Sequence, residues 1–250
     1  MPHRILTSHA GSLPRPDSLI ALSHRRLAMG QEAYDQGLAD AVAAVVRRQH
    51  EIGIDVVNNG EFGHPTGQRY DYGAWWSYVF RRLGGLELAD VSLRAVPVAQ
   101  PKPGRLALGR FLPADRIRFH LCWGSWHGPH VTDIPLADIA GLMLAVNAGG
   151  YAFEAANVRH EHEWKVWQTL ALPEGKVILH GVVSHATNVV EHPELVADRI
   201  VRFAEIVGPR NVIASTDCGL GGRVHPQIAW AKLDTLARGA ELATKRLWGR

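Results

Sequence analysis

The chain has 250 residues, of which 46% are hydrophobic and 20% charged, as is usual for one globular domain with its own core. The formal net charge is +3 with Lys and Arg scattered along the chain, so we expect no nucleic-acid partner. Two distant cysteines give no disulfide framework, and no apolar run reaches the roughly 20 residues of a membrane helix. Because the N-terminus also lacks the apolar core of a signal peptide, we predict a cytoplasmic protein without a membrane partner.

The first part of the chain predicts two strands on either side of a long helix. An apolar strand at residues 4–7 leads into a loop rich in Gly, Ser and Pro. A helix is predicted over residues 31–51, where apolar side chains recur near helical spacing, and Gly53 ends it. Residues 54–57 then form a buried strand, and a further helix is predicted over residues 75–83.

The second part alternates apolar strands with amphipathic helices. The strands are predicted at residues 117–122, 151–156, 177–183 and 212–216. The helices are predicted at residues 135–147, 161–169, 193–207 and 226–247. Continuous apolar strands separated by such helices indicate a parallel sheet covered by helices, which is an α/β fold.

Polar side chains follow the carboxyl end of every predicted strand. In chain order they are His9, Ser12, Arg15, Asn58, Asn59, Glu61, His120, Cys122, Glu154, Asn157, Ser184, His185, Asn188, Asp217 and Cys218. In α/β barrels the carboxyl ends of the strands converge on one face, and that face holds the chemistry. We therefore expect a functional site there.

Four of these residues have the chemistry of a zinc site. His120 and Cys122 are alternate residues of one strand, so their side chains point to the same side and can bind one ion. Imidazole and thiolate are ligands that zinc favours, and Glu154 and Cys218 can complete a tetrahedral set. The alternative is that both cysteines are small buried apolar residues, because a His-x-Cys pair alone is a weak signal. Their common position at strand ends favours zinc.

These residues carry a resemblance to a known family. His-x-Cys at residues 120–122, Glu154 after the next strand and Asp-Cys-Gly at residues 217–219 resemble the cobalamin-independent methionine synthase superfamily, which includes the epoxyalkane:coenzyme M transferases. TSHAGSLPRP at residues 7–16 and Asn-Gly-Glu at residues 59–61 are similar to further motifs of that superfamily. The resemblance extends over nearly the whole chain, from residue 4 to 248.

The resemblance implies roles for the strand-end residues. His120, Cys122 and Cys218 would hold Zn²⁺, with Glu154 as a fourth, exchangeable ligand. His185 would resemble the proton donor to the leaving group, and its alternative is a polar loop histidine bonded to backbone.

Another group would hold the substrate. Gly11, Ser12 and Glu61 resemble the groups that bind the polar end of an amino-acid substrate, and Asn157 is assigned to the same site. The alternative is a strand-end turn in which Ser12 caps a helix. The His-Glu-His-Glu run at residues 160–163 is predicted to be a solvated helix face, because side chains at i and i+2 of a helix diverge.

One departure from the superfamily concerns the fold. Two strand–helix units that its members carry between Gly85 and Arg116 are missing, and residues 92–112 read as an irregular loop in their place. We therefore predict a single domain over residues 1–250, built as a TIM-type (β/α)8-like barrel shortened by about two strand–helix units. An open sheet exposes strand edges, so a two-fold homodimer is expected, with the Pro-rich residues 97–113 at or near the contact.

The function implied is a zinc-dependent thiol alkyltransferase acting on a small-molecule thiol and an alkyl donor. The first form is methyl transfer to homocysteine in methionine biosynthesis. The second is thiol alkylation like that of an epoxyalkane:coenzyme M transferase. The third is a zinc-binding homologue without catalytic activity that serves as a subunit.

Overall fold

The computed structural model describes residues 3–63, 113–124 and 127–249, and every structural statement below refers to these. The helix predicted over residues 75–83 and the irregular loop predicted over residues 92–112 lie outside the described residues, as does nearly all of the Pro-rich stretch 97–113.

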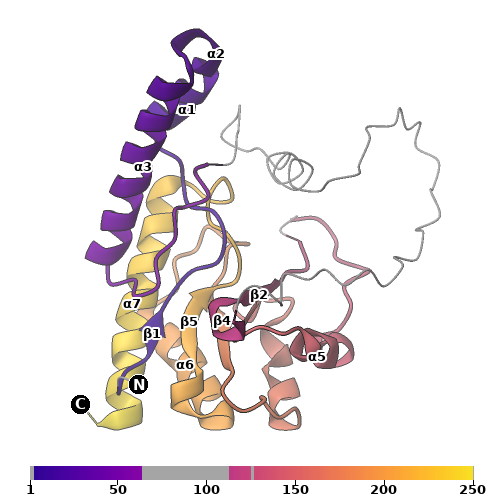
Figure 1. The fold of residues 1–250 in the computed structure, drawn as a ribbon. Helices are drawn as coiled ribbons and strands as arrows, with labels where there is room; N and C mark the ends of the chain where they lie inside the picture. Colours follow the sequence, from indigo (N-terminus) through magenta and orange to yellow (C-terminus); the bar gives the residue numbers. More distant parts are fainter. Residues whose placement is uncertain (1–2, 64–112, 125–126, 250) are drawn as a thin grey trace, which may run out of the picture.

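Five parallel strands form one sheet, and their order follows that of a barrel (Figure 1). They are β1 (Leu6–Thr7), β2 (Arg118–Leu121), β3 (Gly150–Phe153), β4 (Val177–Val183) and β5 (Ile213–Thr216), arranged as β1-β5-β4-β3-β2. The first strand therefore lies beside the last, as it does where a (β/α)8 barrel closes. The strand predicted at residues 54–57 is reduced to a parallel bridge between Val56 and Ser8, at the edge of β1 that faces away from β5.

The sheet curls strongly enough for its two end strands to interact. Arg118, on β2, donates a hydrogen bond from Nη1 to Ser8 Oγ at 3.0 Å, although Ser8 directly follows β1 at the other end of the row. Only a curved sheet allows a side chain to cross in this way. The predicted α/β, barrel-like class is confirmed, and the described strands form an arc that is not closed.

The helices cover the outside of this arc. They include α3 (Gln31–Glu51), α5 (Leu136–Ala145), α6 (Pro193–Val207) and α7 (Pro226–Trp248). Helix α6 packs against α7, and α7 in turn packs against β1, β4 and β5 (Figure 1). Both helices begin with Pro at N1, where the missing N–H costs nothing, and a histidine before each accepts a backbone hydrogen bond as a cap. The sequence predicted these starts correctly.

Two helices replace part of the predicted Gly-, Ser- and Pro-rich loop. They are α1 (Asp17–His24) and α2 (Arg26–Met29), and both pack against α3. Leu19 of α1 is 2% exposed, so burial of its side chain in the core stabilises a segment whose sequence is too short to show a period. Two short 3₁₀ turns, η2 (Ala114–Arg116) and η4 (Pro209–Asn211), precede β2 and β5.

The segment at residues 161–169, predicted as an α-helix, is instead the 3₁₀-helix η3 (Glu161–Gln168). Its Trp167 ring stacks on Phe153 of β3 at 5.3 Å between centroids. Phe203 of α6 in turn lies 6.0 Å from the Phe153 ring. These aromatic contacts anchor η3 to the sheet. In a 3₁₀-helix, side chains three residues apart lie above one another.

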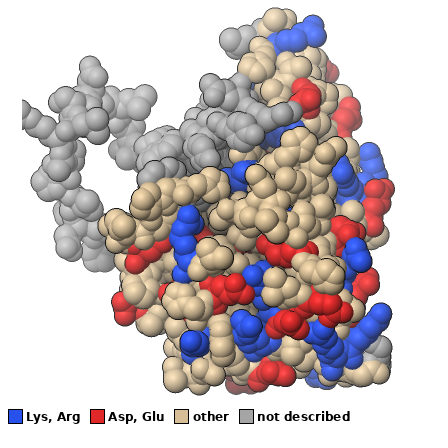
Figure 2. All heavy atoms as spheres, turned by 180° about the vertical axis from the view of Figure 1, so that it is seen from behind, with Lys and Arg blue, Asp and Glu red and all other residues tan. Residues whose placement is uncertain are grey.

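The surface carries mixed charge. Figure 2 shows basic and acidic side chains interspersed on that face of the molecule, with neither sign forming a continuous patch. Within the described ranges, no helix combines the length with the apolar character required to cross a bilayer.

Candidate functional site

Three of the predicted zinc ligands meet across the curved sheet. The ligand atoms of His120, Cys122 and Cys218 all lie within 4.8 Å of one another. Cys122 follows β2 and Cys218 follows β5, and two other strands separate β2 from β5 in the sheet. Because the sheet curls, these ends face each other across its concave side, and the two Sγ atoms are 3.6 Å apart.

This geometry fits zinc. Two sulfur ligands at about 2.3 Å from a tetrahedral zinc ion lie about 3.8 Å from each other. The observed 3.6 Å separation is close to that value and far from the roughly 2.0 Å of a disulfide. One imidazole and two thiols are therefore placed as zinc requires, with room for further ligands.

The two thiols share one proton. The Cys122 thiol donates a hydrogen bond to Cys218, and this bond together with one from His120 lowers the pKa of Cys218 to about 3 against the effect of burial. The same bond, together with burial, raises the pKa of Cys122. Cys218 is therefore a thiolate at neutral pH, and the thiolate is the form that binds metal.

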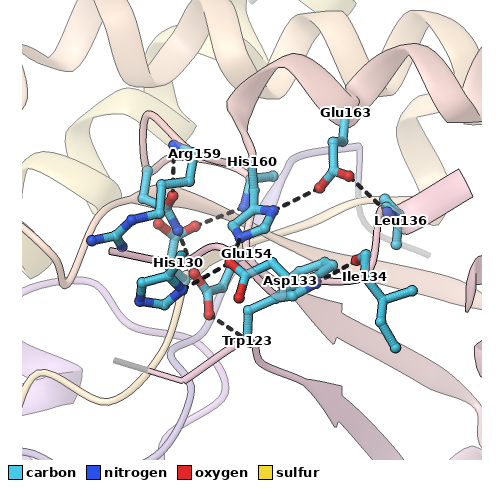
Figure 3. Close-up of polar contacts among 12 residues, drawn as sticks. Trp123, His130, Asp133, Ile134, Leu136, Glu154, Arg159, His160 and Glu163 are labelled. Atoms are coloured by element: carbon cyan, nitrogen blue, oxygen red, sulfur yellow. Dashed lines mark hydrogen bonds and ion pairs between the residues drawn. The ribbon is translucent and has the colours of Figure 1, made fainter. Parts of the chain in front are cut away.

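Glu154, after β3, lies beside this centre with its carboxylate held from two sides (Figure 3). Its Oε1 accepts the backbone N–H of Trp123 at 3.0 Å, and its Oε2 accepts from Asn157 Nδ2. Burial raises the pKa of Glu154, and the neighbouring Cys122 and the N–H of Trp123 act in the opposite direction. The structure thus places Asn157 against Glu154, where it orients that carboxylate, and direct contact of Asn157 with substrate stays a prediction.

His185 lies in a second group of close titratable residues. Its ring, Glu154 and Asp217 have ligand atoms within 4.8 Å of one another, and all three residues are buried. Burial lowers the pKa of His185 to about 4, so the ring is neutral at pH 7. Neither ring nitrogen has a hydrogen-bond partner in the described part of the chain, and the alternative of a histidine bonded to backbone is therefore not observed.

Asp217 is a residue whose role the sequence did not reveal. Its Oδ1 accepts the N–H groups of Ala155 and Ala156, each at 2.8 Å, and so connects the end of β5 to the loop after β3. Burial raises its pKa to about 7, and backbone hydrogen bonds act against that shift. The carboxylate passes over β4 at Gly181, where a Cβ would lie 1.9 Å from Oδ1. The Gly181–Asp217 contact depends on spatial proximity, which no local motif encodes.

The predicted substrate group lies where three strand-end loops join. Leu220 N and Gly221 N donate to the carbonyl of Ser12 at 2.9 and 2.8 Å, and the Gly11 carbonyl accepts from Asn58 at 3.0 Å. Gly11 has a φ of 64°, and a Cβ there would lie 3.1 Å from the backbone of the facing loop. The alternative in which Ser12 caps a helix is wrong, because α1 begins at Asp17.

Glu61 lies near Cys218 and His120, on the side of this group of loops. Its backbone has a φ of 57°, an uncommon conformation for a residue with a side chain and one found more often at functional sites. Burial raises the pKa of its carboxyl to about 7, and the negative charge of Cys218 contributes in the same direction. The structure therefore brings Glu61, Gly11 and Ser12 to the same rim as Cys218.

The prediction of a solvated face at residues 160–163 is wrong for two of the four residues. His160 is 4% exposed and Glu163 is 8% exposed, and His160 Nδ1 lies 2.8 Å from Glu163 Oε2. His160 and Glu163 are three residues apart and lie on the same side, as they would in an α-helix too, whereas the prediction rested on the divergence of side chains two apart. His162 is exposed, as predicted.

Comparisons with known proteins agree with this architecture. No protein-family model matches the chain. A B12-independent methionine synthase from Shewanella sp. W3-18-1, solved in complex with selenomethionine, aligns with a TM-score of 0.67 over 99% of this chain and 100% of that one, at 18% identity. A structure from Listeria monocytogenes, described as a vitamin-B12-independent methionine synthase, aligns with a TM-score of 0.57 over the same shares at 15% identity.

One curated relative matches part of the sequence. A 5-methyltetrahydropteroyltriglutamate–homocysteine methyltransferase from Bradyrhizobium diazoefficiens is 32% identical over 104 residues, which are 39% of this chain. The match covers 13% of that relative's length. Together with the two structures, it confirms the resemblance that the sequence motifs indicated.

Proposed function

We propose that this chain is a zinc-dependent methyltransferase that transfers a methyl group from a small-molecule donor to the thiol of homocysteine. The observation that carries the proposal is the convergence of His120, Cys122 and Cys218 on one point beside Glu154. The fold shared with methionine synthase structures supports the class of reaction, and the partial match to a homocysteine methyltransferase supports the acceptor. Zinc bound there would keep the substrate thiol as a thiolate at neutral pH, which is its nucleophilic form.

His185 is suited to carry the proton of this reaction. Methyl transfer breaks the S–H bond of the thiol and the bond between methyl and donor, forms an S–C bond, and leaves a proton for the donor's leaving atom. Burial keeps the ring of His185 neutral at pH 7, so a ring nitrogen can accept the proton that zinc would displace from the thiol and then release it to that atom. The carboxyl groups of Glu154 and Asp217, within 4.8 Å, stabilise the ring while it is charged.

Glu154 is the ligand that we expect to give way to the substrate. Its carboxylate has hydrogen bonds from Trp123 and Asn157, so it remains paired when it does not bind metal. A buried carboxylate without such partners would resist leaving, because an unpaired charge in the interior is costly. We assign to Glu61, on the same rim as Cys218, the binding of the ammonium group of an amino-acid thiol.

The proposal is tested by metal analysis followed by a screen of thiols. We expect close to one zinc per chain, and in the cobalt-substituted protein we expect absorption bands that shift when homocysteine is added. His185→Asn is the matched variant: it should keep the metal and the homocysteine-induced shift but slow methyl transfer by on the order of 10²- to 10⁴-fold.

Each other outcome points to a different function. A shift with coenzyme M and none with homocysteine would indicate the epoxyalkane-type reaction instead. Bound zinc whose cobalt spectrum responds to no thiol would indicate a metal-binding subunit without activity. A protein that takes up no zinc would contradict the proposal itself.

Two reduced cysteines at the centre suit a reducing compartment, and we propose the cytoplasm.

A further inference from the structure

A network of charged side chains gathers around His160, close to Trp123 and Glu154 (Figure 3). His160 is at its middle, with Nδ1 2.8 Å from Glu163 Oε2 and Nε2 3.2 Å from Asp133 Oδ2. His130 Nδ1 approaches the same Asp133 oxygen at 2.8 Å. The other oxygen of Glu163 accepts the N–H of Leu136 at 2.6 Å, at the first turn of α5.

The two carboxylates fix the protonation state of His160. A carboxylate oxygen can only accept a hydrogen bond, and both ring nitrogens of His160 face one, so both must carry a proton. A neutral imidazole would direct a lone pair at one of the two oxygens. The two carboxylates therefore favour the imidazolium form of His160, and they raise the pKa of this buried ring against the effect of burial.

This cation lies flat on Trp123. The two rings are 4.0 Å apart between centroids with 18° between their planes, which is a stacked arrangement of a cation on the face of an indole. The indole is also fixed at its edge, since Nε1 donates to the carbonyl of Ile134 at 2.7 Å. Both contacts together leave Trp123 a single orientation.

Trp123 joins the network to the metal centre through its backbone. It directly follows Cys122, and its N–H donates to Glu154 Oε1 at 3.0 Å. The peptide that carries this N–H joins Cys122 to Trp123, so it also affects the orientation of Cys122 after the end of β2. The orientation of Trp123 therefore affects two of the four residues that we expect to bind zinc.

We propose that His160 is a positioning residue for the metal centre: stacked on Trp123 and held by Asp133 and Glu163, it fixes the peptide that orients Cys122 and Glu154. This inference rests on the proposed function, because it concerns the zinc site of that function. It assigns a role to the His-Glu-His-Glu run, which the reaction itself does not use.

The experiment compares zinc affinity in His160→Gln and in the matched variant His162→Gln, two residues away on the same run and exposed. Competition with a chromophoric chelator should show a zinc dissociation constant about 10- to 100-fold higher for His160→Gln, as for other residues that orient metal ligands indirectly. His162→Gln should equal the wild type. The cobalt-substituted His160→Gln protein should also have altered absorption bands, a change that lower stability alone would not produce.

The outcomes separate this inference from the proposed function. A wild type that binds no zinc would overturn both. A wild type that binds zinc together with a folded His160→Gln protein of equal affinity and unchanged cobalt spectrum would overturn the inference alone. If His160→Gln does not fold, Asp133→Asn replaces it, since Glu163 still holds the ring, and an unchanged zinc affinity in that variant would equally overturn the inference.

Discussion

The two thiols of the proposed metal centre differ in character although they share one proton. Cys218 has a pKa of about 3, because Cys122 and His120 donate hydrogen bonds to its sulfur, whereas the pKa of Cys122 is raised. Before any metal arrives, the two sulfur atoms therefore already carry a negative charge between them, and this charge attracts a cation to the site.

Replacing Cys218 should consequently remove the metal. Cys218→Ser loses both a ligand and the negative charge that compensates the ion, so we expect the zinc dissociation constant to rise by more than about 100-fold, beyond what loss of an indirect contact causes. Chelator competition measures it, with Cys122→Ser in parallel. Full zinc occupancy in both variants would contradict the assignment of these ligands.

His180, which is not one of the proposed metal ligands, should affect stability in acid. His180 of β4 is fully buried against Phe203, 4.1 Å between ring centroids, and burial lowers its pKa to about 3 from the ordinary 6.5. As the pH falls below 6.5, His180 becomes protonated in the unfolded chain but stays neutral in the folded chain. The free energy of unfolding therefore decreases between pH 6.5 and pH 3, by at most about 1.4 kcal/mol per pH unit from this residue.

Urea unfolding at several pH values tests the contribution of His180. In His180→Leu the unfolding free energy should depend less steeply on pH in that window, because the titrating group is gone. His162→Leu, at an exposed position, should keep the slope of the wild type. Equal slopes in all three proteins would show that His180 does not contribute.

At this scale the sequence predicted that His120, Cys122 and Cys218 come together and missed the residues that support them. His120 and Cys122 could be paired from strand alternation, and Cys218 from its place at a strand end. The bonds of Asp217 to the loop after β3, and the stack of His160 on Trp123, join segments that are distant in sequence. Such contacts follow from tertiary structure and have no local pattern.

At the scale of elements, helix α7 holds the loop that carries His185. Lys232 of α7 is 0% exposed, and its Nζ lies 2.7 Å from Glu191 Oε2. The other oxygen of Glu191 accepts the N–H of Ser184, the residue before His185, at 2.7 Å. The ion pair thus connects a helix on the outside of the sheet to the proposed proton carrier.

Breaking this pair on one side should be costly. Lys232→Met leaves Glu191 buried without its partner, and loss of one member of a buried pair typically costs about 3–5 kcal/mol. The double variant Lys232→Met, Glu191→Gln should recover much of that loss, since neither residue then carries a charge. Arg238→Ala, which removes an exposed pair with Asp234 on the same helix, should cost less than about 1 kcal/mol.

Urea unfolding of the wild type, Lys232→Met, Glu191→Gln and the double variant completes a double-mutant cycle. Independent, additive losses for Lys232→Met and Glu191→Gln would mean that the pair does not act as a unit.

The helices whose ends carry clear signals were predicted to within two residues. The bounds of α3 and α6 agree with the prediction, and α7 extends one residue further. Pro at the first turn marked the starts of α6 and α7, and Gly208 marked the end of α6. The 3₁₀ form of η3 was missed because packing of its aromatic residues on β3 and α6 decides it, and α1 was missed because its turn-rich surroundings hide a short helix.

At the scale of the whole molecule, the arc of strands has two ends. Among the described strands, β2 lies at one end and the bridge at Val56 at the other. Near the β2 end, Val131, Ile134 and Leu142 are 86%, 54% and 72% exposed, although all three are apolar. The parallel, barrel-like order of the strands could be predicted from their alternation with helices. That residues 1–250 form a single domain stays a prediction.

We propose that this end joins a second copy, as expected for an open sheet. Light scattering at micromolar concentration should give about twice the chain mass of 27.5 kDa. Leu142→Glu should shift the protein toward the monomer, because it places a charge in the apolar contact. Val158→Glu, at an equally exposed apolar position after β3, should remain dimeric, and a wild type that is a stable monomer would contradict the proposal.

The contact between Gly181 and Asp217 has a consequence for how this sequence can vary. A Cβ at position 181 would lie 2.8 Å from the Cα of Asp217 as well as 1.9 Å from its Oδ1, so a smaller residue at 217 would not make room for it. Any side chain on Gly181 would push the end of β5 outward, and Cys218 with it. In a library of single substitutions, position 181 should therefore tolerate no replacement, although glycine itself touches neither metal nor substrate. A position without a side chain would thus be as constrained as a residue of the site itself.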